Sequence, residues 1–123
     1  MLAYVVVPIS SEESIQALLD TLTVLDALFL RSHGSIPGIY QSGVRYARER
    51  GREEWLTVPV ILSRGRGDCE DLACWRAAEM RVHGIDARAV VYRSAPHMFH
   101  VVVEHPDGSR EDPSRELGMG RRR

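Results

Sequence analysis

The valine-rich run F-H-V-V-V-E-H, residues 99–105, and the residues P-D-G-S that follow it constrain the fold more than any other feature of this chain. The run has the composition of a β-strand. H-P-D-G-S fits a three-residue hairpin loop, with proline first and glycine in the left-handed position. In that register His105 faces Ser109. We therefore expect two antiparallel strands, at 99–105 and 109–112.

The same register decides which side chains share a face of the sheet. With the three-residue loop, Val102 faces Asp112, and Asp112 becomes the diagonal neighbour of His100 on one face. Their Cα atoms are then about 7–8 Å apart, within reach of a hydrogen bond between carboxylate and imidazole. A two-residue turn at Asp107 and Gly108 would put Asp112 on the opposite face. The turn chemistry thus predicts a His100–Asp112 dyad.

The other elements follow from hydrophobic periodicity and stop signals. Ser10 and Glu13 match a capping box, and apolar residues recur at helical spacing up to His33, which predicts a long helix. We also expect a strand at 2–7, short helices at 44–50 and 57–62, a turn at 65–67, a helix at 69–83 and a strand at 87–93. The fold class is α+β, with helices packed on a small antiparallel sheet.

Length and charge limit the organisation of the chain. Its 123 residues, 44% of them hydrophobic, fit one domain. We divide it into an N-terminal strand and helices (1–54), a catalytic-type core (55–119) and a basic tail (120–123). The formal net charge of −1 gives no support for nucleic-acid binding. No apolar run approaches the roughly 18 residues of a membrane span, and no secretory signal is evident. We expect a cytoplasmic protein.

The segment G-D-C-E-D-L-A-C, residues 67–74, places Cys69 at the first position of a predicted helix whose N-cap is Asp68. Cys69 and Cys74 lie about 140° apart around that helix, which excludes a disulfide. No cysteines or histidines have zinc spacing, so we expect neither a metal site nor a cofactor. Cys74 is predicted to fill the core. Cys69 differs, because the amides and dipole of the helix stabilise a thiolate and an oxyanion.

Acidic neighbours complicate this reading of Cys69, because carboxylates raise the pKa of a thiol. We expect either Glu70 or Asp71 to bind arginine or backbone away from the sulfur. A positive partner is also needed, and an imidazolium is the usual one. We favour His100, at the start of a strand, over His97, which lies in a loop. Because the sequence contains no asparagine, a third group must be aspartate, glutamate or glutamine.

Three candidate catalytic residues follow one another along the chain: Cys69 at a helix N-terminus, His100 on a strand and Asp112 on the next strand. The chain resembles the transglutaminase-like superfamily of papain-like folds over about residues 55–119. The matching pieces are G-D-C-E-D-L-A (67–73), H-G-I-D-A-R-A-V (83–90), F-H-V-V-V-E (99–104) and E-D-P-S-R (111–115). More narrowly, E-E-W-L-T-V-P (53–59) and E-D-P-S-R-E-L-G-M (111–119) are similar to small transglutaminase-like proteins of tailed phages and prophages.

The resemblance implies a cysteine enzyme without a cofactor. Cys69 would be the nucleophile, His100 the general base and acid, and Asp112 the group that orients the imidazole. The thiolate would attack an amide or ester carbonyl, and the thioester would then pass its acyl group to water or to an amine. Hydrolysis and acyl transfer both stay open at this point.

Three further residues are candidates for oxyanion or substrate binding: Asp68, Trp55 and His97. Trp55 lies nearer to the cysteine in sequence than the oxyanion-holding tryptophan of the large transglutaminases, so we do not assign it that role. The expected substrate is a peptide or protein amide in the host cytoplasm. The alternative is a non-catalytic phage virion or assembly module, whose partners are phage structural proteins. The oligomeric state cannot be read from the sequence.

Overall fold

The computed structural model describes residues 4–51 and 53–121 of the chain. Its elements are α1 (Glu12–Ser32), η1 (Ile39–Gln41), β1 (Arg45–Tyr46), α2 (Val58–Arg64), β2 (Arg66–Gly67), α3 (Cys69–Val82), β3 (Arg88–Ala95), β4 (Met98–Glu104), β5 (Arg110–Glu111) and α4 (Pro113–Glu116). Strands β3, β4 and β5 form an antiparallel sheet in that order, and β1 pairs with β2 in parallel. The predicted α+β class is confirmed.

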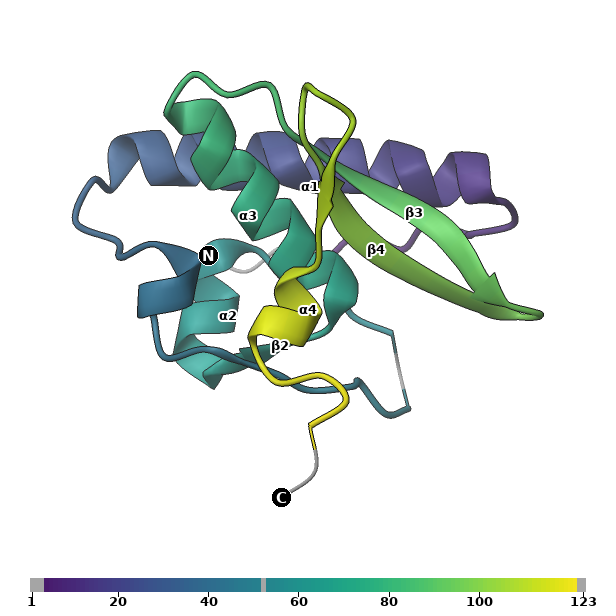
Figure 1. Cartoon of the computed structure of the whole chain (residues 1–123). Coiled ribbons are helices and arrows are strands. Elements are labelled where there is room, and N and C mark those ends of the chain that lie inside the picture. The colour runs from purple at the N-terminus through teal and green to yellow at the C-terminus, as the bar shows by residue number, and fades with distance from the viewer. Residues whose placement is uncertain (1–3, 52, 122–123) are drawn as a thin grey trace.

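Helix α3 occupies the centre of the molecule (Figure 1). It packs against α1, β3 and β4 on one side, and against α2, η1 and α4 on the other. A first core cluster contains Ala27, Leu30, Ile39, Val44, Leu56, Val58, Ile61, Leu72, Trp75, Ala78 and Leu117. A second core cluster contains Leu19, Leu22, Ala73, Cys74, Ala77, Met80, Ala87, Ala89, Val101 and Val103. Both clusters therefore depend on residues of α3.

The β4–β5 hairpin has the predicted register. The N–H of His105 donates to the carbonyl of Ser109 at 2.8 Å, and Gly108 closes the turn with a φ of 88°. Glu104 pairs with Arg110, one step further from the turn. The three-residue loop is confirmed, and it brings the end of β5 to the face of β4 that carries His100.

The long first helix is also confirmed, but its cap lies one residue later than expected. Ser11 is the N-cap, and its hydroxyl accepts a hydrogen bond from the N–H of Ser14 at 3.2 Å. The Ser14 hydroxyl in turn accepts from the N–H of Ser11 at 3.1 Å. The prediction of Ser10 and Glu13 is wrong, because a serine hydroxyl at the third helical position performs the role assigned to the glutamate.

The helix predicted at 44–50 is wrong. Residues Arg45–Tyr46 form β1, which pairs with β2 at Arg66–Gly67, so the predicted turn at 65–67 is partly a strand. Gly65, with a φ of 75°, ends α2 before this strand begins. The pairing joins segments about twenty residues apart, so no local sequence pattern predicts it.

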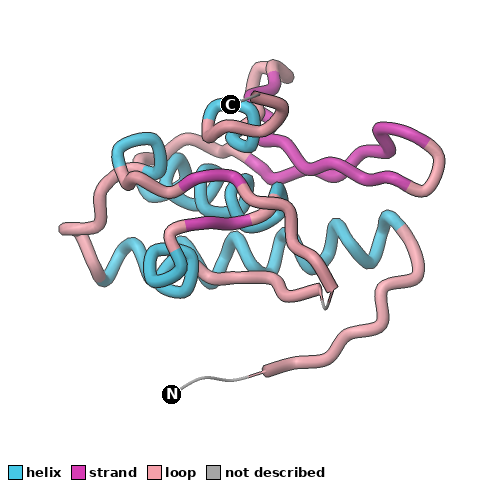
Figure 2. Tube along the Cα trace, turned by 90° about the horizontal axis from the view of Figure 1, so that it is seen from below, coloured by secondary structure: helices cyan, strands magenta, loops and turns pink. Residues whose placement is uncertain are grey.

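The strand predicted at 2–7 is not observed. Residues 4–7 are irregular and exposed, whereas residues 1–3 lie outside the described part. Figure 2 shows an extended loop leading away from the start of α1. The edge of β3 is already occupied: the Gln16 side chain donates to the carbonyl of Ala89 at 2.8 Å and accepts from the N–H of Val91 at 3.2 Å. Among the described residues, no helix is both long and apolar enough to cross a membrane.

Candidate active site

Cys69 is the first residue of α3, as predicted, and a close approach of the backbone puts it there. Strand β2 ends at Gly67, where an added Cβ would lie 3.1 Å from the Cβ of Asp71 and 3.2 Å from the Cδ2 of Leu72. A side chain here would require the side chains of Asp71 and Leu72 to move by a few tenths of an ångström. Gly67 therefore lets the chain pass directly from β2 into the helix that starts at Cys69.

Asp68 caps the helix and uses both carboxylate oxygens. Its Oδ1 accepts from the N–H of Cys69 at 2.7 Å, and its Oδ2 accepts from the N–H of Glu49 at 3.0 Å. Its own N–H donates to the Oδ2 of Asp71 at 3.0 Å, which completes a capping box. The prediction of Asp68 as N-cap is confirmed. The N–H of Cys69 therefore donates to Asp68 and is not free to bind an oxyanion.

His100 and Asp112 lie side by side, as the hairpin register predicted. The His100 Nε2 donates to the Asp112 Oδ2 at 2.8 Å, with 12% and 19% of the two side chains exposed. Asp112 also caps α4, where it accepts from the N–H of Arg115. The ring of Tyr92, opposite His100 on β3, packs edge-on against the imidazole at 5.7 Å. Because Nε2 faces Asp112, the imidazole Nδ1 is the atom left for a further proton transfer.

The Cys69 sulfur lies near β4, where the backbone N–H of Val101, the residue after His100, lowers the pKa of the thiol. Its own proton points to Glu70, with 3.5 Å between Sγ and Oε2. Within residues 4–51 and 53–121, no hydrogen bond joins the sulfur to the His100 ring. The structure thus pairs His100 with Asp112 directly beside the middle of β4 and places Cys69 near the same strand.

The surroundings of Cys69 raise the pKa of its thiol and so favour the protonated form. Burial raises the pKa of Cys69, and the charges of Glu70 and Asp68 raise it further, against the smaller opposing effect of the Val101 N–H. Burial also raises the pKa of Glu70. Asp71 points away from the sulfur and accepts from the N–H of Leu56 at 2.7 Å. The expectation that one acidic neighbour binds backbone is confirmed for Asp71, and Glu70 is the carboxyl that opposes the thiolate.

The chain was compared with the models of known protein families. Residues 36–110, more than half of the chain, match the family model described as the transglutaminase-like superfamily. The chain belongs to this superfamily. The matched range contains Cys69 and His100, and it begins earlier than the predicted resemblance, so that it includes η1 and β1. No curated protein and no solved structure matches the chain.

The remaining sequence candidates of this transglutaminase-like chain lie in different surroundings. Trp55 packs against the second core cluster, as Cys69 does, and its Nε1 donates to the Glu53 Oε1 at 3.3 Å. His97 occupies the exposed turn between β3 and β4 with a left-handed φ of 62°. Trp55 and Cys69 therefore pack against the same core cluster, and among the described residues His97 makes no hydrogen bond to Cys69, His100 or Asp112.

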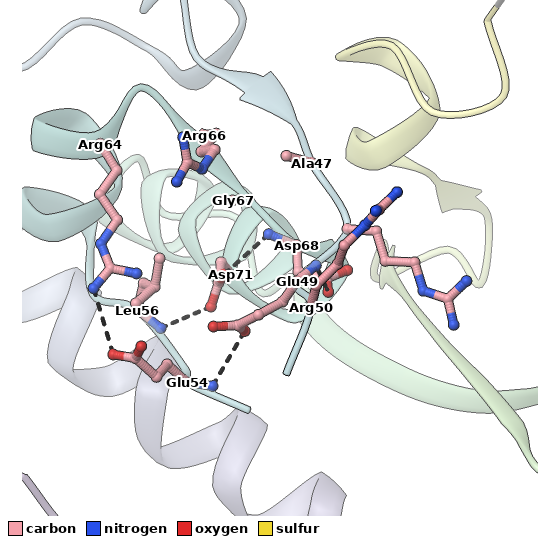
Figure 3. Close-up of a pocket in the computed structure, with 11 residues that line it drawn as sticks. Ala47, Glu49, Arg50, Glu54, Leu56, Arg64, Arg66, Gly67, Asp68 and Asp71 are labelled. Atoms are coloured by element: carbon pink, nitrogen blue, oxygen red, sulfur yellow. Dashed lines mark hydrogen bonds and ion pairs between the residues drawn. The ribbon is translucent and has the colours of Figure 1, made fainter. Parts of the chain in front are cut away.

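A polar pocket of about 450 Å³ adjoins the start of α3 in this family member (Figure 3). Asp68, the residue before Cys69, is part of its wall, and Glu49 and Asp71 point into it. The other lining residues are Ala47, Arg48, Arg50, Glu54, Leu56, Arg64, Arg66 and Gly67. Charges of both signs line this space, which suits a polar segment of a substrate.

Sequence reasoning missed one acidic group beside the thiol. Ligand atoms of Glu49, Glu53 and Glu70 lie within 4.8 Å of one another, and so do those of Asp68, Cys69 and Glu70. Glu49 and Glu53 come from the loop before α2, whereas Glu70 belongs to α3. Ligand spacing along the chain reveals such a group only when its members share an element, which explains why it was not found.

Proposed function

We propose that this chain is a transglutaminase-like cysteine enzyme that acts on amide or ester bonds through a thioester acyl-enzyme. The observation that supports this most is the 2.8 Å contact of His100 with Asp112; the residue after His100, Val101, contributes the backbone N–H that lowers the pKa of Cys69. A thiol, an imidazole and an orienting carboxylate in this order are the groups that acyl transfer by a cysteine requires.

In the proposed reaction, His100 Nδ1 takes the proton of Cys69 while Asp112 holds Nε2 and stabilises the imidazolium. The sulfur forms a bond to the carbonyl carbon, and the carbonyl electrons move to the oxygen. When the oxyanion collapses, the leaving amine or alcohol takes the proton from His100 and a thioester remains. Water or an amine, deprotonated by the same imidazole, then attacks the thioester and restores the thiol.

The resting arrangement requires a side-chain movement before this reaction. The Cys69 proton points to Glu70, so the sulfur must turn toward the His100 ring. The polar pocket beside Asp68 is where we place the acyl donor, a peptide or protein amide. From the sequence similarity over 53–59 and 111–119, we propose that the protein is encoded by a phage or prophage and acts in the host cytoplasm.

A second function, a non-catalytic interaction module of a phage virion or assembly complex, is favoured by a different observation. The Cys69 thiol has a raised pKa, and its amide already binds Asp68, so neither the nucleophile nor this oxyanion donor is prepared in the resting chain. In that case the fold would present a surface to phage structural proteins, and the triad would be incidental.

Acylation by the activated ester p-nitrophenyl acetate distinguishes the two functions. At pH 7 we expect release of p-nitrophenol and an acetyl adduct on Cys69, detected by mass spectrometry and absent in Cys69→Ser. His100→Ala should slow acylation by at least about a hundredfold, because it removes the general base. His97→Ala, which alters the other histidine of the same hairpin, should keep the rate.

Equal acylation rates in the parent chain and His100→Ala would contradict the enzymatic proposal and favour the interaction module. Hydroxylamine provides a chemical check, because it cleaves a thioester rapidly and would remove the acetyl group from the sulfur. The fate of the acyl group then separates the two reaction types: added amines should accelerate deacylation if the enzyme transfers acyl groups, and should have little effect if it only hydrolyses.

A further inference from the structure

Glu111, the last residue of β5, binds side chains from three other segments of the fold. Its Oε2 accepts from the Arg76 Nε of α3 at 2.8 Å and from the Tyr40 hydroxyl of η1. Its Oε1 accepts from the Nε2 of His105, which follows β4, at 2.8 Å. Glu111 directly precedes Asp112 of the candidate dyad. The end of β5 is therefore tied to α3 and η1 at the position next to the dyad.

The carboxylate of Glu111 is ionised, and its partner on α3 is fixed in place. Burial raises the pKa of Glu111, but the hydrogen bonds from Arg76 and Tyr40 and the charge of Arg76 outweigh this effect, so the pKa lies below its ordinary value. The Arg76 guanidinium also lies over the Tyr40 ring, 5.1 Å from its centroid, and binds Glu79 at 3.2 Å. Hydrogen bonds to an ionised carboxylate are about twice as strong as those between neutral groups. Glu111 therefore anchors β5 firmly to α3.

Apart from its bond to His100, the contacts that the structure describes for the Asp112 carboxylate are long. Its Oδ1 accepts from the N–H of Arg115 at 3.4 Å, and the exposed Arg115 side chain lies 3.7 Å from its Oδ2. Strand β5 itself pairs with β4 through only two residues. A charge-assisted N–H···O bond spans about 2.7–2.9 Å, a range that the bond between Arg76 and Glu111 meets and that both Arg115 contacts exceed. Among the described residues, the strongest polar anchor next to Asp112 is therefore Glu111.

We propose that Glu111 is a positioning residue: by holding the end of β5 against α3 and η1, it keeps the Asp112 carboxylate where it orients the His100 imidazole. The inference rests on the proposed function, which gives this dyad the task of proton transfer. Neighbouring Cα atoms are about 3.8 Å apart, so a displacement of Glu111 also displaces Asp112. A misplacement of about 1 Å can reduce an enzymatic rate about a hundredfold. Among the described residues, Glu111 makes no hydrogen bond to Cys69 or His100, so it acts through Asp112.

The hydrogen bond between His100 and Asp112 can be followed without catalytic turnover. A ring N–H that donates to a carboxylate gives a downfield proton signal in NMR spectra, and the bond slows exchange of this proton with water. Asp112→Asn, which removes the carboxylate, identifies the His100 Nε2 proton in the full-length chain. In Glu111→Gln, exchange of this proton should accelerate at least about tenfold, as expected when a hydrogen bond to a charged group is weakened. Acylation by p-nitrophenyl acetate should also slow at least about tenfold, because the imidazole is no longer held in place.

Two further variants separate positioning from a general effect on stability. Glu104→Gln removes a carboxylate that binds Arg110 at 3.4 Å across the same pair of strands. It should keep both rates within about twofold of the parent chain, since an exposed ion pair contributes little. Tyr40→Phe removes one donor to Glu111 from a different element, and should accelerate exchange by less than Glu111→Gln does. Tyr40→Phe also decides the matter if Glu111→Gln does not fold. Urea unfolding of each variant records its stability separately.

Failure of this inference can be told apart from failure of the proposed function. If Glu111→Gln lowers the urea midpoint but keeps the exchange and acylation rates of the parent chain, the packing of α4 alone fixes Asp112, and the inference is overturned. It is also overturned if Glu104→Gln accelerates exchange as much as Glu111→Gln does. The same holds if Glu111→Gln does not fold and Tyr40→Phe leaves the exchange unchanged. If the parent chain is not acylated but exchange still depends on Glu111, the enzymatic function fails and the positioning of the dyad stands.

Discussion

Two adjacent acidic residues at the start of α3, Glu70 and Asp71, have different roles. Asp71 accepts two backbone N–H groups, from Leu56 and Asp68, and so contributes to the cap and to the anchoring of the preceding loop. The Glu70 carboxyl group instead accepts the thiol proton of Cys69, with 3.5 Å between Sγ and Oε2. Asp71 is therefore a structural carboxylate, whereas Glu70 adds to the effect of burial in raising the pKa of Cys69.

Replacing Glu70 by glutamine tests this role at the scale of the residue. Glu70→Gln should lower the pKa of Cys69, because the amide offers an N–H donor to the sulfur and, unlike the carboxyl group with its pKa of about 9, it never becomes negatively charged. If the pKa falls by about one unit, the thiolate fraction below that pKa rises about tenfold. Alkylation of Cys69 by iodoacetamide at pH 7.5, followed by mass spectrometry, should accelerate accordingly.

The neighbouring substitution Glu54→Gln is the matched control for alkylation, because Glu54 lies outside the contacts of the sulfur. It should leave the alkylation rate within about twofold of the parent chain, since a distant exposed charge is screened by salt. An unchanged or slower rate in Glu70→Gln would show that burial alone, and not this carboxyl group, holds the proton on Cys69.

Between elements, α1 stabilises the start of α2 through one buried side chain. Thr57 is the N-cap of α2 but makes no side-chain capping bond. The Asp26 Oδ1, on α1, accepts from the N–H of Val58 at 3.0 Å, whereas its Oδ2 is buried without a partner. Burial raises the pKa of Asp26 to about 8, against the lowering effect of the Val58 N–H. The folded chain therefore favours the protonated carboxyl group.

This shift predicts how stability depends on pH. The contribution of Asp26 is fully present below its unfolded pKa of about 4 and is lost as the pH rises through about 8, because the ionised form is penalised by burial. Asp26→Asn keeps the acceptor for Val58 and removes the ionisation. Its free energy of unfolding should match the parent chain within about 1 kcal/mol at pH 4 and exceed it by about 1–3 kcal/mol at pH 8.

Urea unfolding of both chains across this pH range measures the difference, and comparing the pair removes the contribution of the other titrating groups. If Asp26→Asn were the less stable chain at pH 8, the carboxylate would be ionised and favourable in the fold, contrary to the direction given above.

Which elements the sequence could predict depends on how local their signals are. The β4–β5 hairpin was predictable with its register because Pro106 and Gly108 select the loop, and the His100–Asp112 contact followed from it. The β1–β2 pair was not, because each strand has two residues and its partner is distant in sequence. The contact of the sulfur with Val101 and Glu70 was equally hidden, since it depends on how α3 packs on β4.

At the scale of the whole molecule, α3 joins the two core clusters. Leu72, Trp75 and Ala78 face the first cluster, and Ala73, Cys74, Ala77 and Met80 face the second. Because α3 is buried on both sides, unfolding of either cluster would expose apolar surface of the helix. We therefore expect the chain to unfold as one cooperative unit, because neither cluster has a central helix of its own.

The two tryptophans allow that prediction to be tested cluster by cluster. Trp75 is fully buried in the first cluster, and Trp55 packs against the second. In Trp55→Phe the fluorescence reports on the first cluster alone, and in Trp75→Phe on the second. Within each variant, the urea midpoint from fluorescence should coincide with the midpoint from far-UV circular dichroism, because one cooperative unit unfolds in a single step. Trp75→Phe should have the lower midpoint of the two, since it removes the larger buried volume. A fluorescence midpoint that departs from the circular dichroism midpoint in either variant would mean that one cluster opens before the other, and that α3 is a boundary between two cooperative units.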